Sequence, residues 1–539
     1  MKKLKTFIIL LFIVNNTHAQ VSWAKQIGSP STTQGEFGQI ISDGINTYMV
    51  GKFGGNLFLP NDTLFANGSN DIFITKFDAN GNNLWSKNIG GNSSSTMDSE
   101  NGNAVFDPIN NCIYLSGHFT NSMYLSGIGY LSGNSDIFLI KMDLDGNFIW
   151  AKKAGGNGND QAQVYVNPYG KIYLVTQSTD SAYFDNFHIG QGGAIVTFDN
   201  NGNCLSAERK YNFNFTTDQN SVSISFLGND IIYYGSYISQ IFYLDTTTLN
   251  PIGDYDAFIA RADSAGKLKW VHSIGADGQD GITSVQTNNN KITFLGVFSD
   301  TVNLFGSTLN LAGFDIVLSK IDANGNLKWI KKFDLNSNTI VVGHKIKYAT
   351  IGENIIVTGF FNGTANFGNL QMTASTSQDM FLAKFDTIGD CLSYFNFGLA
   401  SGRALEIDNS NNIYVCGNFS NTVNIGNSNY TVYGGSSDIY LAKFNASLGN
   451  NTRTAPNNSL IIYANPTKGT CNITIPDDLK RSPNLTLMIY NAQGSLIQKQ
   501  PIQQLQDKIK LNLEAESKGV YNVSLGDGYR MYYGKIVFD

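Results

Sequence analysis

A repeated phrase constrains this chain more than any other sequence feature. Asp71–Trp85 opens with Asp-Ile-Phe, passes through Lys and Asp to a Gly-containing turn, and ends in Trp; Asp136–Trp150 repeats it closely. With degenerate and truncated copies included, we count seven, which begin at Asp71, Asp136, Gly193, Asp256, Asp315, Asp379 and Asp438. The mean interval is about 61 residues, a period typical of folds that use one small β-unit per repeat.

Each repeat has the pattern of two β-hairpins. In the second copy, residues 103–106 and 112–119 flank a Pro-containing turn, and residues 136–142 and 148–152 flank an Asp/Gly/Asn turn. Glycine recurs in the second turn because a tight hairpin needs a residue at positive φ. These glycines are Gly81, Gly146, Gly202, Gly266, Gly325 and Gly389. The sequence therefore predicts four strands per repeat and an all-β fold.

The last repeat lacks its Trp strand, and the missing strand has a counterpart near the start of the chain. Asp438–Phe444 is not followed by a Trp segment, whereas Val21–Gly28 has the form of that segment. Such a division is useful in a ring, because the N-terminal strand can pair with the last sheet and remove two exposed strand edges. We therefore expect residues 20–450 to form a seven-bladed β-propeller with N-terminal strand closure.

All five tryptophans fall in this fourth strand, at Trp23, Trp85, Trp150, Trp270 and Trp329. One shared position indicates a common packing role between blades rather than separate ligand sites. The phrase resembles the repeats of secreted bacterial β-propellers, whose pattern is Asp-x-Phe-x-x-Lys-x-Asp-x-x-Gly followed by a Trp strand. This resemblance implies the fold but no particular activity.

The N-terminal residues predict export. Lysines precede the apolar run Phe7–Val14, and small residues lead up to Ala19, so we expect a signal peptide over residues 1–19. That run is too short to span a bilayer, and no later segment qualifies as an integral membrane segment. The formal net charge is −6, which disfavours nucleic acid as a partner. We expect a secreted, acidic monomer.

The chain changes character after the repeats. Residues 451–458 form a polar linker, and residues 459–539 alternate apolar strands with Gly turns, which predicts a small C-terminal β-sandwich. Four motifs occur in order there: Asn-Pro-x-x-Gly, Tyr-Asn-x-x-Gly, Gly-x-Tyr and a final strand with Lys. Their residues are Asn465, Pro466, Gly469, Tyr490, Asn491, Gly494, Gly519, Tyr521 and Lys535.

These motifs resemble the type A C-terminal sorting domain of the type IX secretion system of Bacteroidetes. Ala464 departs mildly from the family pattern, which more often has Pro there. The resemblance implies the type IX secretion machinery as a partner. It also implies a final location outside the cell or on the outer-membrane surface.

The sequence assigns no catalytic, cofactor-binding or metal-binding residue. Its histidines lack zinc spacing, no nucleophile elbow or dinucleotide loop is present, and the five cysteines follow no disulfide or metal pattern. Features common to all blades are architectural, so a site should lie where one blade departs from the others. Ionisable candidates for such a site are His118, Glu208, Asp218 and Glu353.

Three hypotheses about function follow. The first is a non-enzymatic binding or scaffold module for a glycan or protein ligand, on a loop face or at the central channel. The second is a polysaccharide hydrolase or lyase with a carboxylate- or His-based site in the channel. The third is a structural, adhesin-like surface component. Clustering of the four candidates would favour the enzyme, and a groove of aromatic and amide side chains would favour binding.

Overall fold

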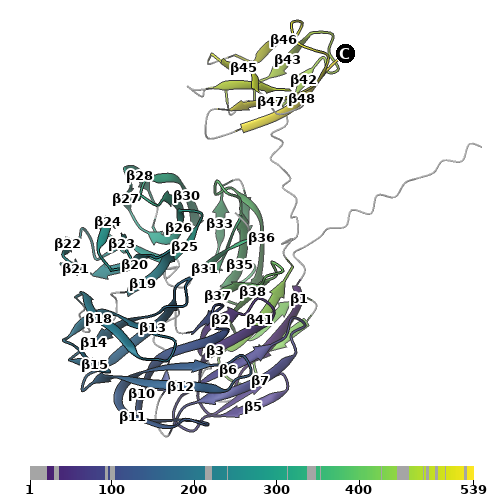
Figure 1. Ribbon diagram of the computed structural model, residues 1–539. Helices are drawn as coiled ribbons and strands as arrows, with labels where there is room; N and C mark the ends of the chain where they lie inside the picture. Colours follow the sequence, from purple (N-terminus) through teal and green to yellow (C-terminus); the bar gives the residue numbers. More distant parts are fainter. Residues whose placement is uncertain are drawn as a thin grey trace, which may run out of the picture. The chain divides into compact units, whose positions relative to one another are not determined.

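The chain forms two compact units, residues 1–451 and 452–539. The computed structural model describes residues 21–29, 36–91, 95–96, 104–212, 221–238, 241–311, 313–336, 347–351, 354–368, 370–426, 428–445, 460–476, 479–480, 485–491, 496–503, 506–526 and 531–539. These residues contain strands and turns but no helix (Figure 1). The expected signal peptide and the expected linker 451–458 lie outside the described residues.

Each repeat of the first unit folds into four antiparallel strands in chain order. The first sheet is β2 (Glu36–Ser42), β3 (Thr47–Phe53), β6 (Asp71–Phe77) and β7 (Asn83–Ile89). The next three sheets contain β9 (Ala104–Asp107), β10 (Cys112–Leu125), β11 (Gly129–Met142) and β12 (Phe148–Gly156), with short β8 (Ser95–Thr96) beside β10; β13 (Asp160–Val166), β14 (Ile172–Ser178), β17 (Gly192–Phe198) and β18 (Cys204–Tyr211); and β19 (Ser221–Leu227), β20 (Asp230–Ile238), β23 (Tyr255–Ala262) and β24 (Leu268–Ile274).

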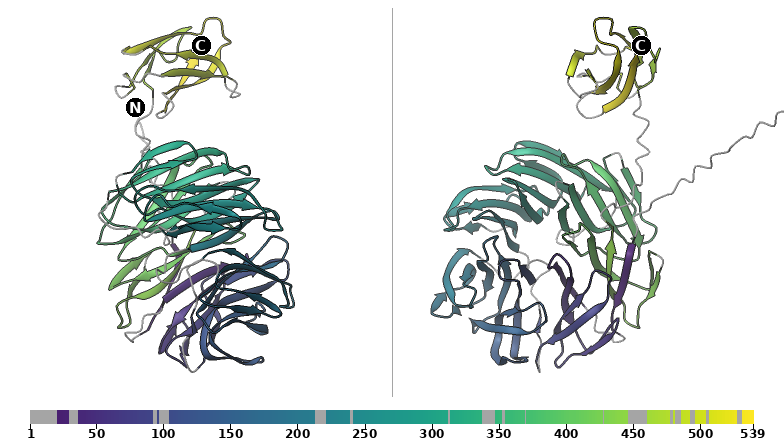
Figure 2. Two further views of the ribbon diagram at one scale, coloured as in Figure 1. Left: turned by 90° about the vertical axis from the view of Figure 1, so that its left-hand side faces the viewer. Right: turned by 45° about the vertical axis from the view of Figure 1, so that its right-hand side comes forward.

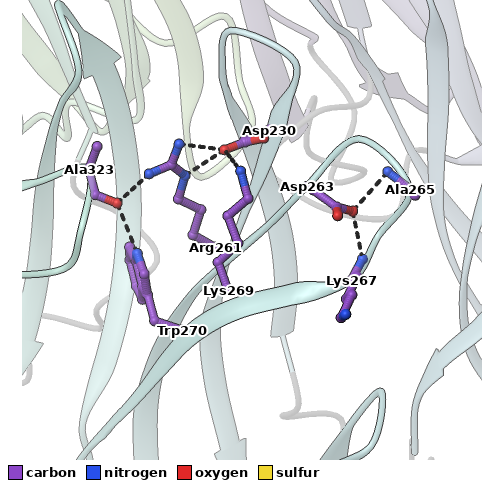
Figure 3. A network of polar contacts seen from close by, with 8 residues as sticks. All are labelled: Asp230, Arg261, Asp263, Ala265, Lys267, Lys269, Trp270 and Ala323. Carbon is purple, nitrogen blue, oxygen red and sulfur yellow. Dashed lines mark hydrogen bonds and ion pairs between the residues drawn. The ribbon is translucent and has the colours of Figure 1, made fainter.

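Two further sheets repeat this order. They contain β25 (Gly281–Asn288), β26 (Lys291–Phe298), β29 (Asp315–Asp322) and β30 (Leu327–Asn336), and then β31 (Lys347–Ile351), β32 (Asn354–Phe361), β35 (Asp379–Phe385) and β36 (Cys391–Gly398). The six recurrent turn glycines all have positive φ, as the sequence predicts. In the fourth repeat, the Asp263 carboxylate accepts the backbone N–H groups of Ala265 and Lys267, each at 3.0 Å (Figure 3).

The remaining sheet combines both ends of the repeat region. Its strands are β37 (Ala404–Ile407), β38 (Ile413–Phe419), β41 (Asp438–Phe444) and β1 (Val21–Ile27). β1 pairs antiparallel with β41, so that Ala24 lies opposite Ala442 and Ile27 opposite Ile439. Figure 2 shows the purple β1 among the green strands of the last repeat. β1 thus occupies the fourth-strand position that the last repeat lacks.

The sheets pack face to face through apolar clusters. Ile74 of β6, for example, lies in one cluster with Ile113 and Phe138 of the next sheet. Similar clusters join each sheet to the next along the chain, and one joins the last sheet to the first, with Tyr414 and Met49 among its members. Because both faces are covered, β6 and β41 are buried at all seven positions. The unit is a β-propeller-like array of sheets.

The tryptophans fasten neighbouring sheets together. Trp270 Nε1 and Arg261 Nη1 both donate to the carbonyl oxygen of Ala323 in the turn of the following sheet, at 2.9 and 2.5 Å (Figure 3). The other four indoles make the same contact: Trp23 to Ala79 at 3.1 Å, Trp85 to Leu144 at 3.3 Å, Trp150 to Asn200 at 3.1 Å and Trp329 to Thr387 at 2.9 Å. The common packing role predicted for the tryptophans is confirmed.

The structure adds a short outer hairpin between the second and third strands of every repeat, in addition to the four strands that the sequence predicts. These hairpins are β4 (Asn56–Leu59) and β5 (Asp62–Phe65), the outer halves of β10 and β11, β15 (Ala182–Phe184) and β16 (Phe187–Ile189), β21 (Phe242–Leu244) and β22 (Thr247–Leu249), β27 (Thr301–Leu304) and β28 (Ser307–Asn310), β33 (Thr364–Phe367) and β34 (Leu370–Thr373), and β39 (Thr422–Ile425) and β40 (Ser428–Thr431). Strands of three or four residues carry too little alternation to stand out in sequence.

The second unit has two sheets around its own core. One contains β42 (Ile462–Tyr463), β43 (Thr470–Thr474) and β46 (Lys508–Asn512), and the other β45 (Leu496–Pro501), β44 (Thr486–Tyr490), β47 (Gly519–Gly526) and β48 (Met531–Phe538). Ile473 and Leu511 of the first sheet share an apolar cluster with Leu487, Val523 and Ile536 of the second. This arrangement has the layers of a small β-sandwich.

Candidate functional site

The outer hairpins show where repeats differ. Each first hairpin strand has one outward-facing residue between two buried apolar residues. In the last three repeats this residue is Asn303, Asn366 or Asn424. In the first four it is aromatic: Phe58, Tyr124, Tyr183 and Tyr243. One structural position therefore carries aromatic side chains in one run of repeats and amides in the other.

Three of these aromatic residues are open to solvent. Two of them have a second ring on the opposite strand, which enlarges the exposed aromatic surface. Tyr124 lies opposite Tyr130 with ring centroids 5.0 Å apart, and Tyr183 lies opposite His188 at 4.9 Å. Tyr124, Tyr130, Tyr183 and Tyr243 are 49%, 72%, 56% and 47% exposed. We call Tyr124, Tyr130, Tyr183, His188 and Tyr243 the aromatic arc.

Phe58 does not belong to the aromatic arc. Its ring packs edge-on against Tyr433 of the last repeat, with centroids 5.5 Å apart. The Phe58 side chain is half-buried, because Tyr433 of a neighbouring repeat covers part of it. At this one hairpin position, the exposed aromatic residues are thus those of the second, third and fourth repeats, although Phe65 and Tyr433 are exposed elsewhere.

Backbone hydrogen bonds fix the hairpins of the aromatic arc to the preceding sheets. Tyr124 N–H donates to Gly90 O at 2.9 Å, and Tyr183 pairs with Gly155 at the end of β12. Tyr243 N–H donates to the Asn212 side chain at 2.7 Å. Figure 1 places β15, β21 and β22 at the periphery of the first unit. The ring positions are therefore set by the sheets and not by free loops.

The hairpin segments of the aromatic arc contain no basic residue, although Lys210 lies 3.9 Å from Asp245 and Arg209 lies beside Gly192. Residues 120–134, 179–192 and 239–254, which include its three hairpins, have no Lys or Arg and only Asp180, Asp185, Asp245 and Asp254 as acids. The electrostatic character of this surface is neutral to acidic. It does not suit a polyanion.

The ionisable candidates from the sequence do not form one site among the described residues. His118 lies on β10 opposite Ile137 and is half-buried. Glu208 lies on β18 of the following sheet and pairs with Lys210 at 2.8 Å. Asp218 and Glu353 lie outside the described residues. The structure therefore keeps His118 and Glu208 on different sheets.

Sequence reasoning missed Glu406, an acid on the first strand of the last sheet. β37 lies beside β2 and β31, the first strands of the neighbouring sheets. Burial raises the pKa of Glu406 to about 7, although its Oε1 accepts the Ile407 N–H at 3.0 Å. The register places Ile41 and Val105 at the same position of earlier repeats. An alignment of first strands would have shown this departure.

Within the part of the chain that the structure describes, no three His, Cys, Asp or Glu side chains gather closely enough to hold a metal ion. All five cysteines are free thiols, and three of them are buried. Burial raises the pKa of the Cys391 thiol to about 12, so this side chain is a poor nucleophile at neutral pH.

The Asn-Pro-x-x-Gly motif holds the last strand of the second unit. The Asn465 side chain accepts the Val537 N–H at 2.8 Å and donates to the Lys535 carbonyl at 2.6 Å. Pro466 follows it, and the Gly469 carbonyl accepts the Leu513 N–H at 2.7 Å. The first motif and the last strand are thus joined directly.

The other motif residues lie on the second sheet of this unit or at its ends. Tyr490 ends β44 and Asn491 follows it, while Gly494 lies outside the described residues. Gly519 begins β47 with φ 154°, and Tyr521 Oη donates to the Ser517 carbonyl. Lys535 is exposed on β48 opposite Asn522.

Comparison with known proteins identifies the second unit. Residues 461–539 match the family described as secretion system C-terminal sorting domain. The second unit is such a domain, and with the fold of the first unit it defines a β-propeller-like protein exported by the type IX secretion system. Among the described residues, no helix is long and apolar enough to cross a membrane.

Similarity to individual proteins is limited. A "Funoran endo-beta-hydrolase" from Wenyingzhuangia aestuarii is 41% identical over 98 residues, which cover 18% of this chain and only 12% of that protein. "Structure of Dos1 propeller" aligns with TM-score 0.36 and 9% identity over 74% of this chain and 76% of that chain. "Phage phi92 endosialidase" aligns with TM-score 0.36 and 10% identity over 96% and 87%. These TM-scores are low, and the strand pairing itself defines the architecture.

Proposed function

We propose that this protein is a closed seven-bladed β-propeller, delivered to the cell surface or the medium, that binds a glycan or protein ligand without catalysing a reaction. The observation that carries the proposal is the aromatic arc. Exposed aromatic side chains occupy three consecutive hairpins, and the same position carries Asn in the last three repeats.

Ring closure is supported by contacts between the last and first repeats. Trp23 of β1 and Lys443 of β41 both donate to the Ala79 carbonyl, at 3.1 and 2.9 Å. The same two-donor contact, with Arg261 in place of Lys, joins consecutive repeats at Ala323. The joint between the ends of the repeat region therefore has the chemistry of the internal joints, which favours a ring without free sheet edges.

The aromatic arc suits recognition because its rings are both exposed and rigidly placed. Exposed aromatic side chains lose little conformational entropy on binding and offer an apolar face together with a polar tip. Neighbouring repeats show that Asn suffices for folding at this position, so the fold does not require the aromatic side chains. A binding role explains why solvent-exposed Tyr is present instead.

The test compares two matched triple variants of the secreted protein. Tyr124→Ala with Tyr183→Ala and Tyr243→Ala should abolish ligand binding on a glycan array and in protein interaction assays. The control changes the equivalent positions in the other repeats, Asn303→Ala with Asn366→Ala and Asn424→Ala, and should keep it. Equal binding by wild type and both variants would refute a role for the aromatic arc.

We further propose that the second unit directs export and that residues 1–19 are a removable signal peptide. The Asn465 side chain donates to the Lys535 carbonyl, so the first family motif contacts the last strand, and we expect the secretion machinery to recognise this part of the unit. Deleting residues 456–539 should trap the propeller in the periplasm, as measured by cell fractionation. Unchanged surface display or release would contradict this assignment.

Glu406 supports a second candidate function, a polysaccharide hydrolase or lyase. A carboxyl group with a pKa of about 7 is partly protonated at neutral pH and can act as a general acid. In that case the Glu406→Gln variant should lose polysaccharide turnover. The aromatic arc variants should keep part of the turnover, because Glu406 is unchanged in them. A turnover screen that detects no product with wild-type protein would exclude this candidate.

A further inference from the structure

We infer that the ligand of the aromatic arc is an uncharged polysaccharide whose chain crosses three successive outer hairpins. The inference rests on the proposed binding function of the aromatic arc. It goes beyond that proposal by naming the class of ligand and the direction in which the ligand lies.

The repeat of the fold makes the aromatic arc a repeated site. Tyr124, Tyr183 and Tyr243 hold the same position in consecutive repeats, between two buried residues and just before the hairpin turn. Each is tied at its backbone to the end of the preceding sheet. The protein therefore presents one recognition element three times at a fixed spacing, which matches a ligand that presents one chemical unit many times.

The side chains suit sugar rings. The face of a Tyr ring is electronegative and apolar, so it attracts the weakly positive C–H groups on the face of a pyranose, and the phenol oxygen remains in water to bond hydroxyl groups. Tyr130 and His188 add a second ring in the first two hairpins, inclined by 52° and 45° to the ring of the arc Tyr, whereas Thr248 lies opposite Tyr243. The first two hairpins consequently offer a larger contact than the third.

The charge of the surface decides between neutral and anionic polymers. The three hairpin segments contain four aspartates and no Lys or Arg. Of the two cations beside these segments, Lys210 is already paired with Glu208 at 2.8 Å and Asp245 at 3.9 Å, and Arg209 lies beside Gly192. A sulfated or uronic-acid polymer would therefore meet more acidic than basic groups along the three hairpins. The same reasoning disfavours nucleic acid and acidic peptides. Among the ligands that the charge allows, an uncharged carbohydrate chain fits best, because its identical units match the repeated hairpin position.

Three linked subsites should make binding depend on chain length. A short oligosaccharide can occupy one hairpin, whereas a polymer can occupy all three and gains affinity because the later contacts are intramolecular. Each Tyr→Ala change should weaken polymer binding about three- to tenfold. The triple variant should lose between about thirtyfold and about a thousandfold, and the matched Asn→Ala triple variant should change by less than about twofold.

The experiment measures binding of the full-length secreted protein to two sets of polymers by affinity gel electrophoresis and calorimetry. The neutral set is β-glucan, xylan, mannan and galactan, and the anionic set is alginate, polygalacturonate and heparin. Oligosaccharides of increasing length, cut from any polymer that binds, give the chain-length profile. Circular dichroism checks that every variant is folded.

The inference is supported if at least one neutral polymer binds, if Tyr124→Ala, Tyr183→Ala and Tyr243→Ala each weaken it, and if affinity rises with length beyond one subsite. Binding that depends on the aromatic arc but is seen only with an anionic polymer, with a protein or equally with a disaccharide would overturn the inference and leave the proposed function standing. Absence of binding to every polymer of both sets would overturn the inference alone, because the proposed function also admits a protein ligand. Polymer binding that the triple variant leaves unchanged would overturn the proposed role of the aromatic arc itself.

Discussion

At the scale of single residues, the turn glycines serve two purposes at once. Gly325 has φ +82°, and a Cβ atom there would lie 2.7 Å from His272 Nε2 and 3.2 Å from Trp270 Cδ2. Gly306 has φ +84° but open space around it. The first glycine is therefore needed for both backbone conformation and packing between sheets, and the second for conformation alone.

This difference gives a matched pair of variants. Gly306→Ala should cost about 1–2 kcal/mol of unfolding free energy, because only backbone strain is added. Gly325→Ala should cost about 1–3 kcal/mol more, because the methyl group also displaces the indole and imidazole. Urea unfolding followed by Trp fluorescence measures both. Equal losses of unfolding free energy in the two variants would mean that a methyl group at Gly325 does not disturb the packing of Trp270 and His272.

A second residue-scale prediction concerns Asp280, which is buried among hydrogen-bond donors. Burial raises its pKa to about 6, although the N–H groups of Ser299 and Ala276 bond the carboxylate. The folded state therefore binds a proton more tightly than the unfolded state, and this contribution to stability is lost as pH rises from about 4 to about 6.

The Asp280→Asn variant should not show this loss of stability with rising pH, because its side chain does not titrate. Its stability should fall less than that of the wild type between pH 4 and pH 6, whatever the change in absolute stability from losing one acceptor oxygen. Urea midpoints at several pH values provide the measurement. Parallel pH profiles for the two proteins would show that Asp280 does not titrate in this range.

At the scale of elements, the pairing of β1 with β41 decides whether the ring closes. Ala24 lies opposite Ala442, a cross-strand distance that suits a disulfide. Ala24→Cys with Ala442→Cys should therefore form an intramolecular disulfide on oxidation, detected by mass spectrometry of peptides. Ala383 holds the position of Ala442 in the preceding repeat, and Ala24→Cys with Ala383→Cys should not cross-link. Cross-linking in the control only would contradict the pairing.

At the scale of the whole molecule, the two units should unfold separately. The apolar cluster around Ile473 and Leu487 contains only residues of the second unit, and the clusters of the first unit end at Phe444. Protein lacking residues 452–539 should therefore keep the urea midpoint of the first unit within error, because it loses none of that unit's core. A large shift in this midpoint would show that the units depend on each other for stability.

Much of this architecture follows from local sequence. The sequence predicts four strands per repeat, and a Gly turn in six of the seven repeats, because apolar alternation and the need for positive φ act over a few residues. The shared position of the tryptophans predicts one packing role, and their indoles all donate to the turn of the next sheet. The sorting-domain motifs were likewise readable, because each is a short pattern of fixed spacing.

Tertiary structure alone decided which side chains are exposed and which of them share a surface. Tyr124, Tyr183 and Tyr243 lie in three different repeats, and only the outer hairpins with their bonds to the preceding sheets give them the same exposed position in each repeat. The sequence also gives no sign that Glu406 is surrounded by neighbouring first strands, which is what raises its pKa. The physical reason is that solvent exposure and desolvation depend on sheets contributed by distant parts of the chain, whereas strand and turn preferences depend on adjacent residues.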